Sequence, residues 1–229
     1  MEQEITYQYN SQYQEQPPPP PPPRPVRDRR INYGVVWIIL TCVVMFALQI
    51  MDRTGLEILW MWPNENLEAW QFVTSAFLHG GISHIFWNMF MLYMFGMALE
   101  NLIGTKRFVA LFLIAGIIGN IGYVLFCIAT GSDTPAVGAS GALYGVFACL
   151  AILLPNMRVY FFFAIPMKMI HALLFYAAID IVFIGANDSI AHAAHIAGLV
   201  AGLAFGLYLR KKLPVRPPVV NRYQNAPYR

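Results

Sequence analysis

Charged residues are scarce in this chain of 229 residues: Asp, Glu, Lys and Arg make up 12%, whereas 58% of residues are hydrophobic. The mean hydropathy is +0.52, which excludes a soluble domain of this length. Cysteine is also rare, and Cys42, Cys127 and Cys149 lie in three different apolar runs. This spread favours small core residues over disulfide, metal or nucleophile roles. The long apolar runs that remain indicate a polytopic membrane protein.

Six apolar runs are candidates to cross a bilayer, at about 20 residues each. They are Gly34–Met51, Ile82–Leu99, Phe108–Ala129, Ala139–Leu154, Met169–Ile184 and Ile190–Leu209. The expected fold class is therefore all-α, a polytopic membrane protein with a bundle of six transmembrane helices.

Basic residues predict how these runs are oriented. Of the 15 Lys and Arg residues, only Arg53 falls in a loop that this count places outside. The positive-inside rule then predicts that both termini are cytoplasmic. The cluster Arg210-Lys211-Lys212 after the last run also requires an even number of crossings. The net charge of +3 is thus a signal of topology, with the lipid bilayer and not nucleic acid as the partner.

The expected six-helix domain covers residues 31–212, between two tails. Residues 1–30 are polar and contain seven consecutive prolines, Pro17–Pro23, so we predict a disordered or polyproline II cytoplasmic tail. A plain tether is favoured over a ligand for a partner domain. Residues 213–229 are predicted to be a short cytoplasmic tail. We expect no cleavable signal peptide, because the first apolar run is long enough to span.

The segment 52–81 between the first two runs contains Trp60, Trp62 and Trp70. Tryptophan at this density is typical of a segment that lies in the membrane interface. An ordinary extracellular loop with a few aromatic anchors is equally compatible with the sequence.

Ser140 lies in a turn of small residues, Gly138-Ala139-Ser140-Gly141, at the start of the fourth run. From Ser140 to Leu154 this run is about 15 residues or about 22 Å long, against a hydrocarbon core of about 30 Å. Because Pro155 and Arg158 fix its cytoplasmic end, Ser140 is expected below the outer surface. Irregular backbone at that depth implies a water-filled pocket that opens outward.

Glycines at four-residue spacing, Gly141/Gly145 and Gly198/Gly202/Gly206, predict that the fourth and sixth runs pack together. Such packing brings His195 within reach of Ser140. A serine hydroxyl needs a base to become a nucleophile, and neutral histidine is the usual base near pH 7. Polar groups in hydrocarbon usually mark function, so the pair predicts hydrolysis inside the membrane.

His84 and Asn88 are spaced i, i+4 in the second run and share one face. With the backbone around Ser140, they are the expected donors to an oxyanion. The alternative is an interhelical hydrogen bond that only holds the bundle together.

The sequence resembles the rhomboid intramembrane serine proteases over about residues 35–210. The matching elements are His84-x-x-x-Asn88, Gly96-x-x-x-Glu100, Gly104-Thr105-Lys106-Arg107-Phe108, Gly138-x-Ser140-Gly141 and His195-x-x-Gly198. One departure is Trp70-Gln71, where the family often has Trp-Arg; it leaves open which polar loop contact replaces that of the arginine.

The resemblance implies an intramembrane serine endopeptidase with a Ser140–His195 dyad and no third acid. His84, Asn88 and the Ser140 amide would bind the oxyanion, and Tyr144 would pack against the catalytic imidazole. The expected substrates are single-pass membrane proteins cut near their outer end, and the expected location is the plasma membrane. The sequence carries no signal of oligomeric state.

Several other polar residues compete for roles in this site. His192 is an alternative base, although only His195 precedes Gly198 in the packing register. Asp133 and Asp188 are possible triad acids that are better explained as solvated loop residues, and Asp180 is expected to make only an interhelical hydrogen bond. No cofactor is expected, and no metal, because the histidines are not paired with carboxylates or thiols at ligand spacing.

Two other functions are compatible with the composition. An inactive rhomboid-like protein would bind transmembrane helices without cutting them, but it is expected to lack the serine or the histidine. A small transporter or channel would use the histidines as proton relays, but the sequence shows no inverted repeat or paired broken helices.

Overall fold

The computed structural model of the chain describes residues 33–52, 55–64, 66–161, 164–186 and 191–212. The predictions for the tails 1–30 and 213–229, and for Asp188, lie outside these residues. The helices are α2 (Tyr33–Met51), η1 (Glu57–Leu59), α3 (Gln71–Thr74), η2 (Ser75–Phe77), α4 (Ile82–Met91), the π-helix η3 (Leu92–Gly96), α5 (Met97–Ile103), α6 (Thr105–Thr130), α7 (Ser140–Leu153), α8 (Met169–Phe183) and α9 (His192–Lys212). The strands are β1 (Arg158–Phe161) and β2 (Ile165–Lys168).

All six predicted runs are helical, and this confirms the class of an all-α polytopic membrane protein. Within the described residues, four helices are long and apolar enough to span: α2, the continuous α4–η3–α5, α6 and α9. The other two, α7 and α8, have 14 and 15 residues. The shortness of the fourth helix is as predicted. The position of its start below the membrane surface stays a prediction.

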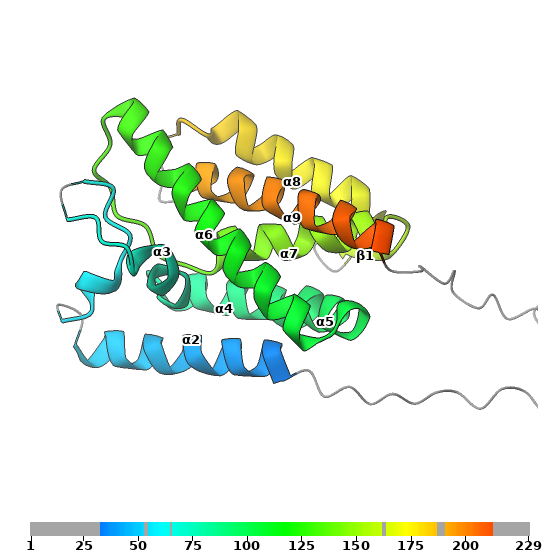
Figure 1. The fold of residues 1–229 in the computed structure, drawn as a ribbon, viewed down its shortest axis with the longest axis horizontal. Coiled ribbons are helices and arrows are strands. Elements are labelled where there is room, and N and C mark those ends of the chain that lie inside the picture. Colours follow the sequence, from blue (N-terminus) through cyan, green and yellow to red (C-terminus); the bar gives the residue numbers. More distant parts are fainter. Residues whose placement is uncertain (1–32, 53–54, 65, 162–163, 187–190, 213–229) are drawn as a thin grey trace, which may run out of the picture.

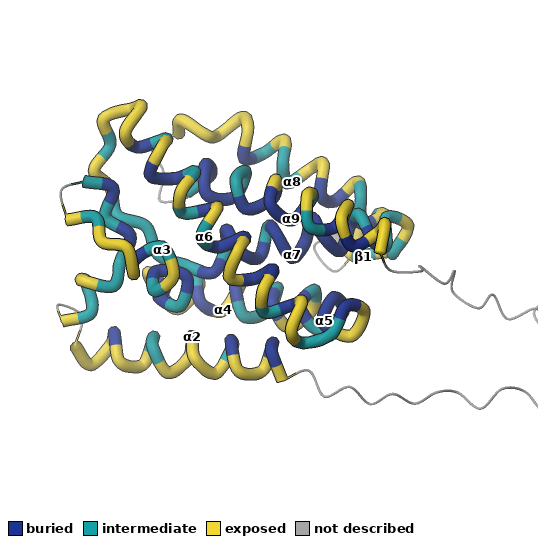
Figure 2. The backbone as a smooth tube through the Cα atoms, in the orientation of Figure 1, coloured by how far each residue is buried: buried dark blue, intermediate teal, exposed yellow. Residues whose placement is uncertain are grey.

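α7 is the central helix of the bundle. It is buried along most of its length, whereas α2 and α8 turn large exposed apolar faces outward (Figures 1 and 2). The outward residues include Trp37 on α2 and Val182 on α8. In a bilayer such faces contact lipid, so the apolar surface is what a membrane protein requires.

The two glycine stripes bring α7 and α9 into backbone contact, as predicted. A methyl group on Gly198 would overlap the carbonyl of Gly141, and one on Gly202 would overlap the carbonyl of Gly145. Because only hydrogen atoms separate the two backbones at these positions, the spacing of α7 and α9 is fixed tightly.

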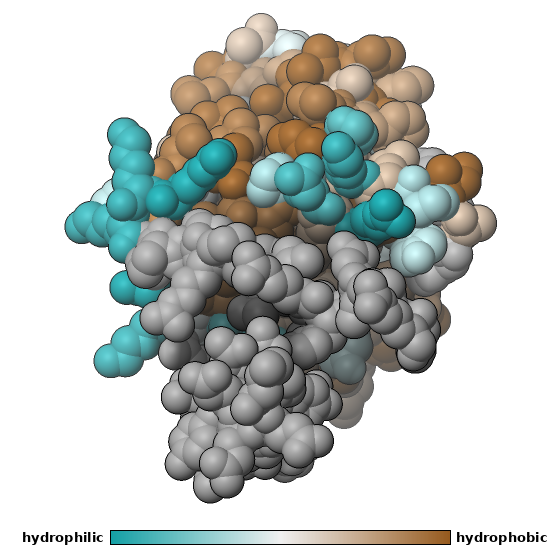
Figure 3. Space-filling view, turned by 90° about the vertical axis from the view of Figure 1, so that its right-hand side faces the viewer, coloured by the Kyte–Doolittle hydropathy of each residue, from teal (hydrophilic) through white to brown (hydrophobic). Residues whose placement is uncertain are grey.

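The start of α2 and the end of α9 lie at the same end of the bundle (Figure 1). Hydrophilic side chains gather at this end, beside a hydrophobic flank (Figure 3), and α9 finishes there with Arg210, Lys211 and Lys212. This arrangement agrees with an even number of crossings. The cytoplasmic location of both ends stays a prediction.

A two-stranded antiparallel hairpin follows α7, with Arg158 opposite Lys168. It was not expected, because each strand has only four residues and the flanking helices dominate the hydropathy pattern. Val159, Tyr160 and Ile165 explain it locally, since β-branched and aromatic residues favour strands.

The segment 52–81 is folded, and Gln71 holds it together. The Gln71 side chain is almost fully buried; its amide oxygen accepts from the Trp62 and Glu68 amides at 3.1 and 3.3 Å, and its Nε2 donates to the Ile58 and Asn66 carbonyls at 3.3 and 3.0 Å. Where the family often has arginine after the tryptophan, Gln71 therefore makes the polar contacts of this loop. The interfacial position of this segment stays a prediction.

Glu100 of α5 fixes the first turn of α2. Its two carboxylate oxygens accept hydrogen bonds from the backbone N–H groups of Gly34 and Val35, each at 2.9 Å, and Thr105 Oγ1 donates to the same carboxylate at 2.6 Å. A carboxylate is well suited here, because the first N–H groups of a helix lack intrahelical partners and carry partial positive charge.

We expect Glu100→Ala to lower the free energy of unfolding by roughly 3 kcal/mol, because it removes three hydrogen bonds to a charged group and leaves buried N–H groups unsatisfied. Thermal unfolding in detergent measures this loss. Glu68→Ala, which removes an exposed loop carboxylate, is the matched control and should unfold like the parent. Equal stability of the two variants would contradict the capping role of Glu100.

Candidate active site

Ser140 is the first residue of α7, and the turn that precedes it needs glycine. Gly138 has φ of +130°, and a methyl group there would come within 2.7 Å of the His84 imidazole. The Gly138 amide donates to the Ser75 carbonyl at 2.9 Å, which fixes the turn against η2. Because no side chain caps the start of α7, its first N–H groups are available near the Ser140 hydroxyl.

His195 faces this hydroxyl from α9. The distance between His195 Nε2 and Ser140 Oγ is 2.9 Å, within hydrogen-bond reach. Tyr144, one turn after Ser140, stacks on the imidazole with ring centroids 4.3 Å apart and an interplanar angle of 9°. The tyrosine thereby restricts rotation of the histidine ring. The structure thus brings together the three residues that the sequence motifs placed on two helices.

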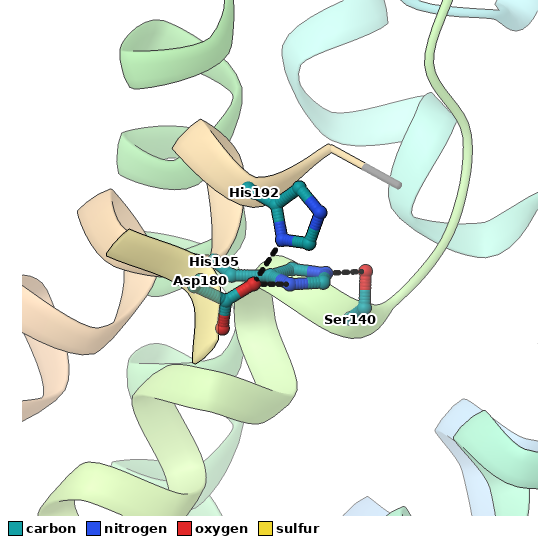
Figure 4. Close-up of polar contacts among 4 residues, drawn as sticks. All are labelled: Ser140, Asp180, His192 and His195. Atoms are coloured by element: carbon teal, nitrogen blue, oxygen red, sulfur yellow. Dashed lines mark hydrogen bonds and ion pairs between the residues drawn. The ribbon is translucent and has the colours of Figure 1, made fainter. Parts of the chain in front are cut away.

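Asp180 from α8 lies on the other side of the imidazole (Figure 4). Its Oδ1 is 2.9 Å from His195 Nδ1 and 2.6 Å from His192 Nδ1. The interhelical hydrogen bond expected of Asp180 is therefore present. Spacing along the chain revealed no carboxylate at ligand distance from the histidines, because α8 brings this one in from another helix.

Asp180, His192 and His195 also form the kind of group that can hold a metal ion, with ligand atoms within 4.8 Å of one another. Zinc ligands lie at about 2.0–2.2 Å in tetrahedral array, which separates neighbouring ligand atoms by about 3.3 Å. The observed separations of 2.6 and 2.9 Å are shorter and fit direct hydrogen bonds. Hydrogen bonding is therefore the better account of this cluster.

A pocket of about 940 Å³ opens beside the pair. Ser140, His195, His84, Asn88 and Tyr144 all contribute to its lining. Most of its other lining residues come from α4 and η3, from the loop after α6, and from α7 and α8. The apolar ones include Trp87, Met91, Phe95, Leu143, Phe147 and Tyr176. The pocket thus joins a polar end at Ser140 to an apolar groove.

The hydrogen bonds of His84 and Asn88 leave donors directed to this pocket. His84 Nδ1 accepts from the Gly80 amide at 3.3 Å, so in the neutral ring Nε2 carries the proton. Asn88 Nδ2 donates one hydrogen to the His84 carbonyl at 3.0 Å and keeps a second. Both side chains therefore retain an N–H group beside Ser140, as an oxyanion site needs.

His79 packs against His84. It is 1% exposed, and its ring meets that of His84 edge to face at 5.2 Å. Burial, together with repulsion from His84, lowers the pKa of His79 to about 3. His79 is thus a neutral packing group at physiological pH.

Of the remaining candidates, Asp133 is exposed in the loop after α6, as expected of a solvated residue. His192 contacts Asp180, whereas the histidine that contacts Ser140 is His195. Asp180 is the residue whose position was missed. The available signal was an acidic residue within an apolar helix, which is costly unless it has a partner.

Comparisons with known proteins identify the family to which the chain is similar. Residues 66–212 match the family model of the Rhomboid domain, so α2 lies outside the matched segment. The chain is similar to RHOMBOID-like protein 6, mitochondrial, of Arabidopsis thaliana (36% identity, 62% of this chain and 44% of that protein) and to the putative rhomboid protease YdcA of Bacillus subtilis (35%, 64% and 71%).

A human relative, presenilin-associated rhomboid-like protein, mitochondrial, is 30% identical over 76% of this chain and 48% of its own length. The chain thus spans less than half of the plant and human proteins but most of the bacterial one.

Proposed function

We propose that this chain, which belongs to the rhomboid family, is an intramembrane serine endopeptidase with Ser140 as nucleophile and His195 as base. The observation that carries the proposal is the 2.9 Å contact between Ser140 Oγ and His195 Nε2 in a pocket that also contains His84 and Asn88. An inactive binding protein would have no need of this hydrogen-bonded pair.

The first half of the reaction forms an acyl-enzyme. Ser140 Oγ attacks the scissile carbonyl carbon while its proton passes to His195 Nε2. Negative charge develops on the carbonyl oxygen, which accepts from His84 Nε2–H, Asn88 Nδ2–H and the N–H groups at the start of α7. The C–N bond then breaks as His195 returns the proton to the leaving nitrogen.

Water completes the cycle. It attacks the acyl carbon while His195 Nε2 takes a proton from it, and the ester bond to Ser140 breaks as that proton returns to Oγ. The outward pocket is the source of this water. Peptide hydrolysis below the membrane surface requires such access, because hydrocarbon holds no water of its own.

Rhomboid proteins act on membrane proteins in the bilayer, and we propose single-pass proteins as substrates here. The apolar part of the pocket, between α4–η3 and α7–α8, suits a hydrophobic segment, and its polar end suits an exposed peptide bond. A transmembrane helix must unwind locally to present that bond, so we expect cleavage near its outer end.

The chain is an integral membrane protein by its spanning helices. We propose that both termini are cytoplasmic and that the plasma membrane is its location. Two of the three relatives described above carry "mitochondrial" in their names, and this makes an organelle membrane the competing location.

Purified protein in detergent, with no added metal or nucleotide, is expected to cleave a reporter transmembrane segment at a single site, and EDTA is expected to leave the rate unchanged. Mass spectrometry of the products and a fluorophosphonate probe that labels Ser140 measure this. Loss of cleavage with chelator would contradict the serine mechanism. Binding of the reporter without cleavage or labelling would identify an inactive rhomboid-like protein.

A further inference from the structure

Asp180 has no role in the Ser140–His195 mechanism described above. It is the one acidic residue of α8 and is 1% exposed. An acidic group inside an apolar helix is costly, and such groups usually pair with a partner that gives them a function. Its partners here are the two imidazoles of His192 and His195.

The geometry indicates which atoms carry protons. Both imidazole Nδ1 atoms lie within 2.9 Å of the same carboxylate oxygen, Asp180 Oδ1. A protonated oxygen donates to only one nitrogen, whereas an ionised oxygen accepts from both. With Asp180 ionised, its Oδ1 is the acceptor for both rings, and each histidine donates from Nδ1.

This arrangement sets the tautomer of His195. With its proton on Nδ1, the neutral ring has its lone pair on Nε2, which is the atom 2.9 Å from Ser140 Oγ. Ser140 must then donate to Nε2, as a nucleophile about to lose its proton does. The stacked ring of Tyr144 keeps the imidazole in this plane.

We propose that Asp180 is a positioning residue that holds His195 in the Nδ1–H tautomer and stabilises its positive charge during proton transfer, with His192 as the second donor that fixes the carboxylate. The site then works as a Ser140–His195–Asp180 triad in place of the dyad that the family resemblance implies. This inference rests on the proposed function.

The experiment compares Asp180→Asn with Asp133→Asn, the same chemical change at an exposed loop carboxylate. The amide of Asp180→Asn is able to donate to His195 Nδ1, which places the ring proton on Nε2 and removes the acceptor that Ser140 needs. We expect kcat for a reporter transmembrane segment to fall about 10²–10⁴-fold, since loss of a triad acid costs up to about 10⁴-fold.

Two further readouts separate positioning from a merely structural role. KM should change less than about twofold, because Asp180 does not line the substrate pocket. The rate of fluorophosphonate labelling at Ser140 should fall with kcat, because labelling needs the same base. Asp180→Glu, which keeps a carboxylate, should recover part of both rates, and Asp133→Asn should match the parent.

The outcome that would overturn the proposal is a kcat of Asp180→Asn within about threefold of the parent in a preparation in which Ser140→Ala is inactive; the proposed function would then stand with a dyad. Cleavage by Ser140→Ala would instead contradict the proposed function itself.

If Asp180→Asn does not fold, the parent protein still decides the question. In ¹⁵N-histidine-labelled protein, with the His195 signal assigned by its loss in His195→Gln, we expect the ring proton on Nδ1. A proton on Nε2 would overturn the proposal.

Discussion

Replacement of Ser140 by alanine is expected to reduce turnover of a transmembrane reporter below detection, because it removes the oxygen that forms the acyl-enzyme and no covalent route remains. Fluorophosphonate labelling should disappear with it. Ser83→Ala is the matched control, since Ser83 is a second serine that lines the same pocket. Residual cleavage by Ser140→Ala at the parent site would show that another group is the nucleophile.

His195→Ala should be as inactive as Ser140→Ala, and the double variant should be no worse than either. The serine and the histidine act as one unit, so their losses do not add. His171→Ala, which removes an exposed histidine of α8, is expected to retain parent activity. A double variant with a further large loss would indicate two independent contributions.

The expected effects of His84→Ala and Asn88→Ala are smaller. Each removes one oxyanion donor among several, and loss of one such donor typically costs about 10²–10³-fold in turnover. Cleavage should stay measurable, and Ser140 should still react slowly with the probe. Unchanged turnover combined with lower thermal stability would assign both side chains to holding the bundle together.

Gly198→Val is expected to produce the largest effect outside the site. The added atoms would overlap the Gly141 carbonyl, so α7 and α9 would have to move apart. Overpacking typically costs about 1–3 kcal/mol and occasionally more, and the separation would also break the contact between Ser140 and His195. We therefore expect a lower melting temperature in detergent and loss of turnover in whatever protein still folds.

Gly185→Val is the matched control for this variant, because a side chain at Gly185 meets open space. It should unfold and cleave like the parent. If Gly198→Val were as stable as Gly185→Val, the close contact between the two helices would be contradicted.

Features that depend on residues close together along the chain were predictable from the sequence. Hydropathy located the six helices, and the four-residue spacing of Gly141, Gly145, Gly198 and Gly202 predicted a contact that the backbone geometry bears out. The turn at Gly138 and the run beginning at Ser140 were recognisable for the same reason, since each occupies consecutive positions.

The position of Asp180 was not predictable in this way. α8 is apolar on all sides, so its hydropathy does not indicate which face turns inward. The contact with His195 depends on the rotation of α8 and on its shift along α9, which only the packed bundle defines. The polar contacts of Gln71 were missed for a similar reason, because they join five residues through a folded loop.

The contact between Glu100 and the first turn of α2 has a consequence for the order of events during synthesis. Gly34 precedes Glu100 by 66 positions, so α2 leaves the ribosome and enters the membrane well before its partner exists. When Glu100 enters the membrane, the first N–H groups of α2 are already in place and lack intrahelical partners. The N–H donors in the first turn of α2 therefore meet their carboxylate acceptor only after α5 has been inserted, and the docking of α2 is completed at that stage.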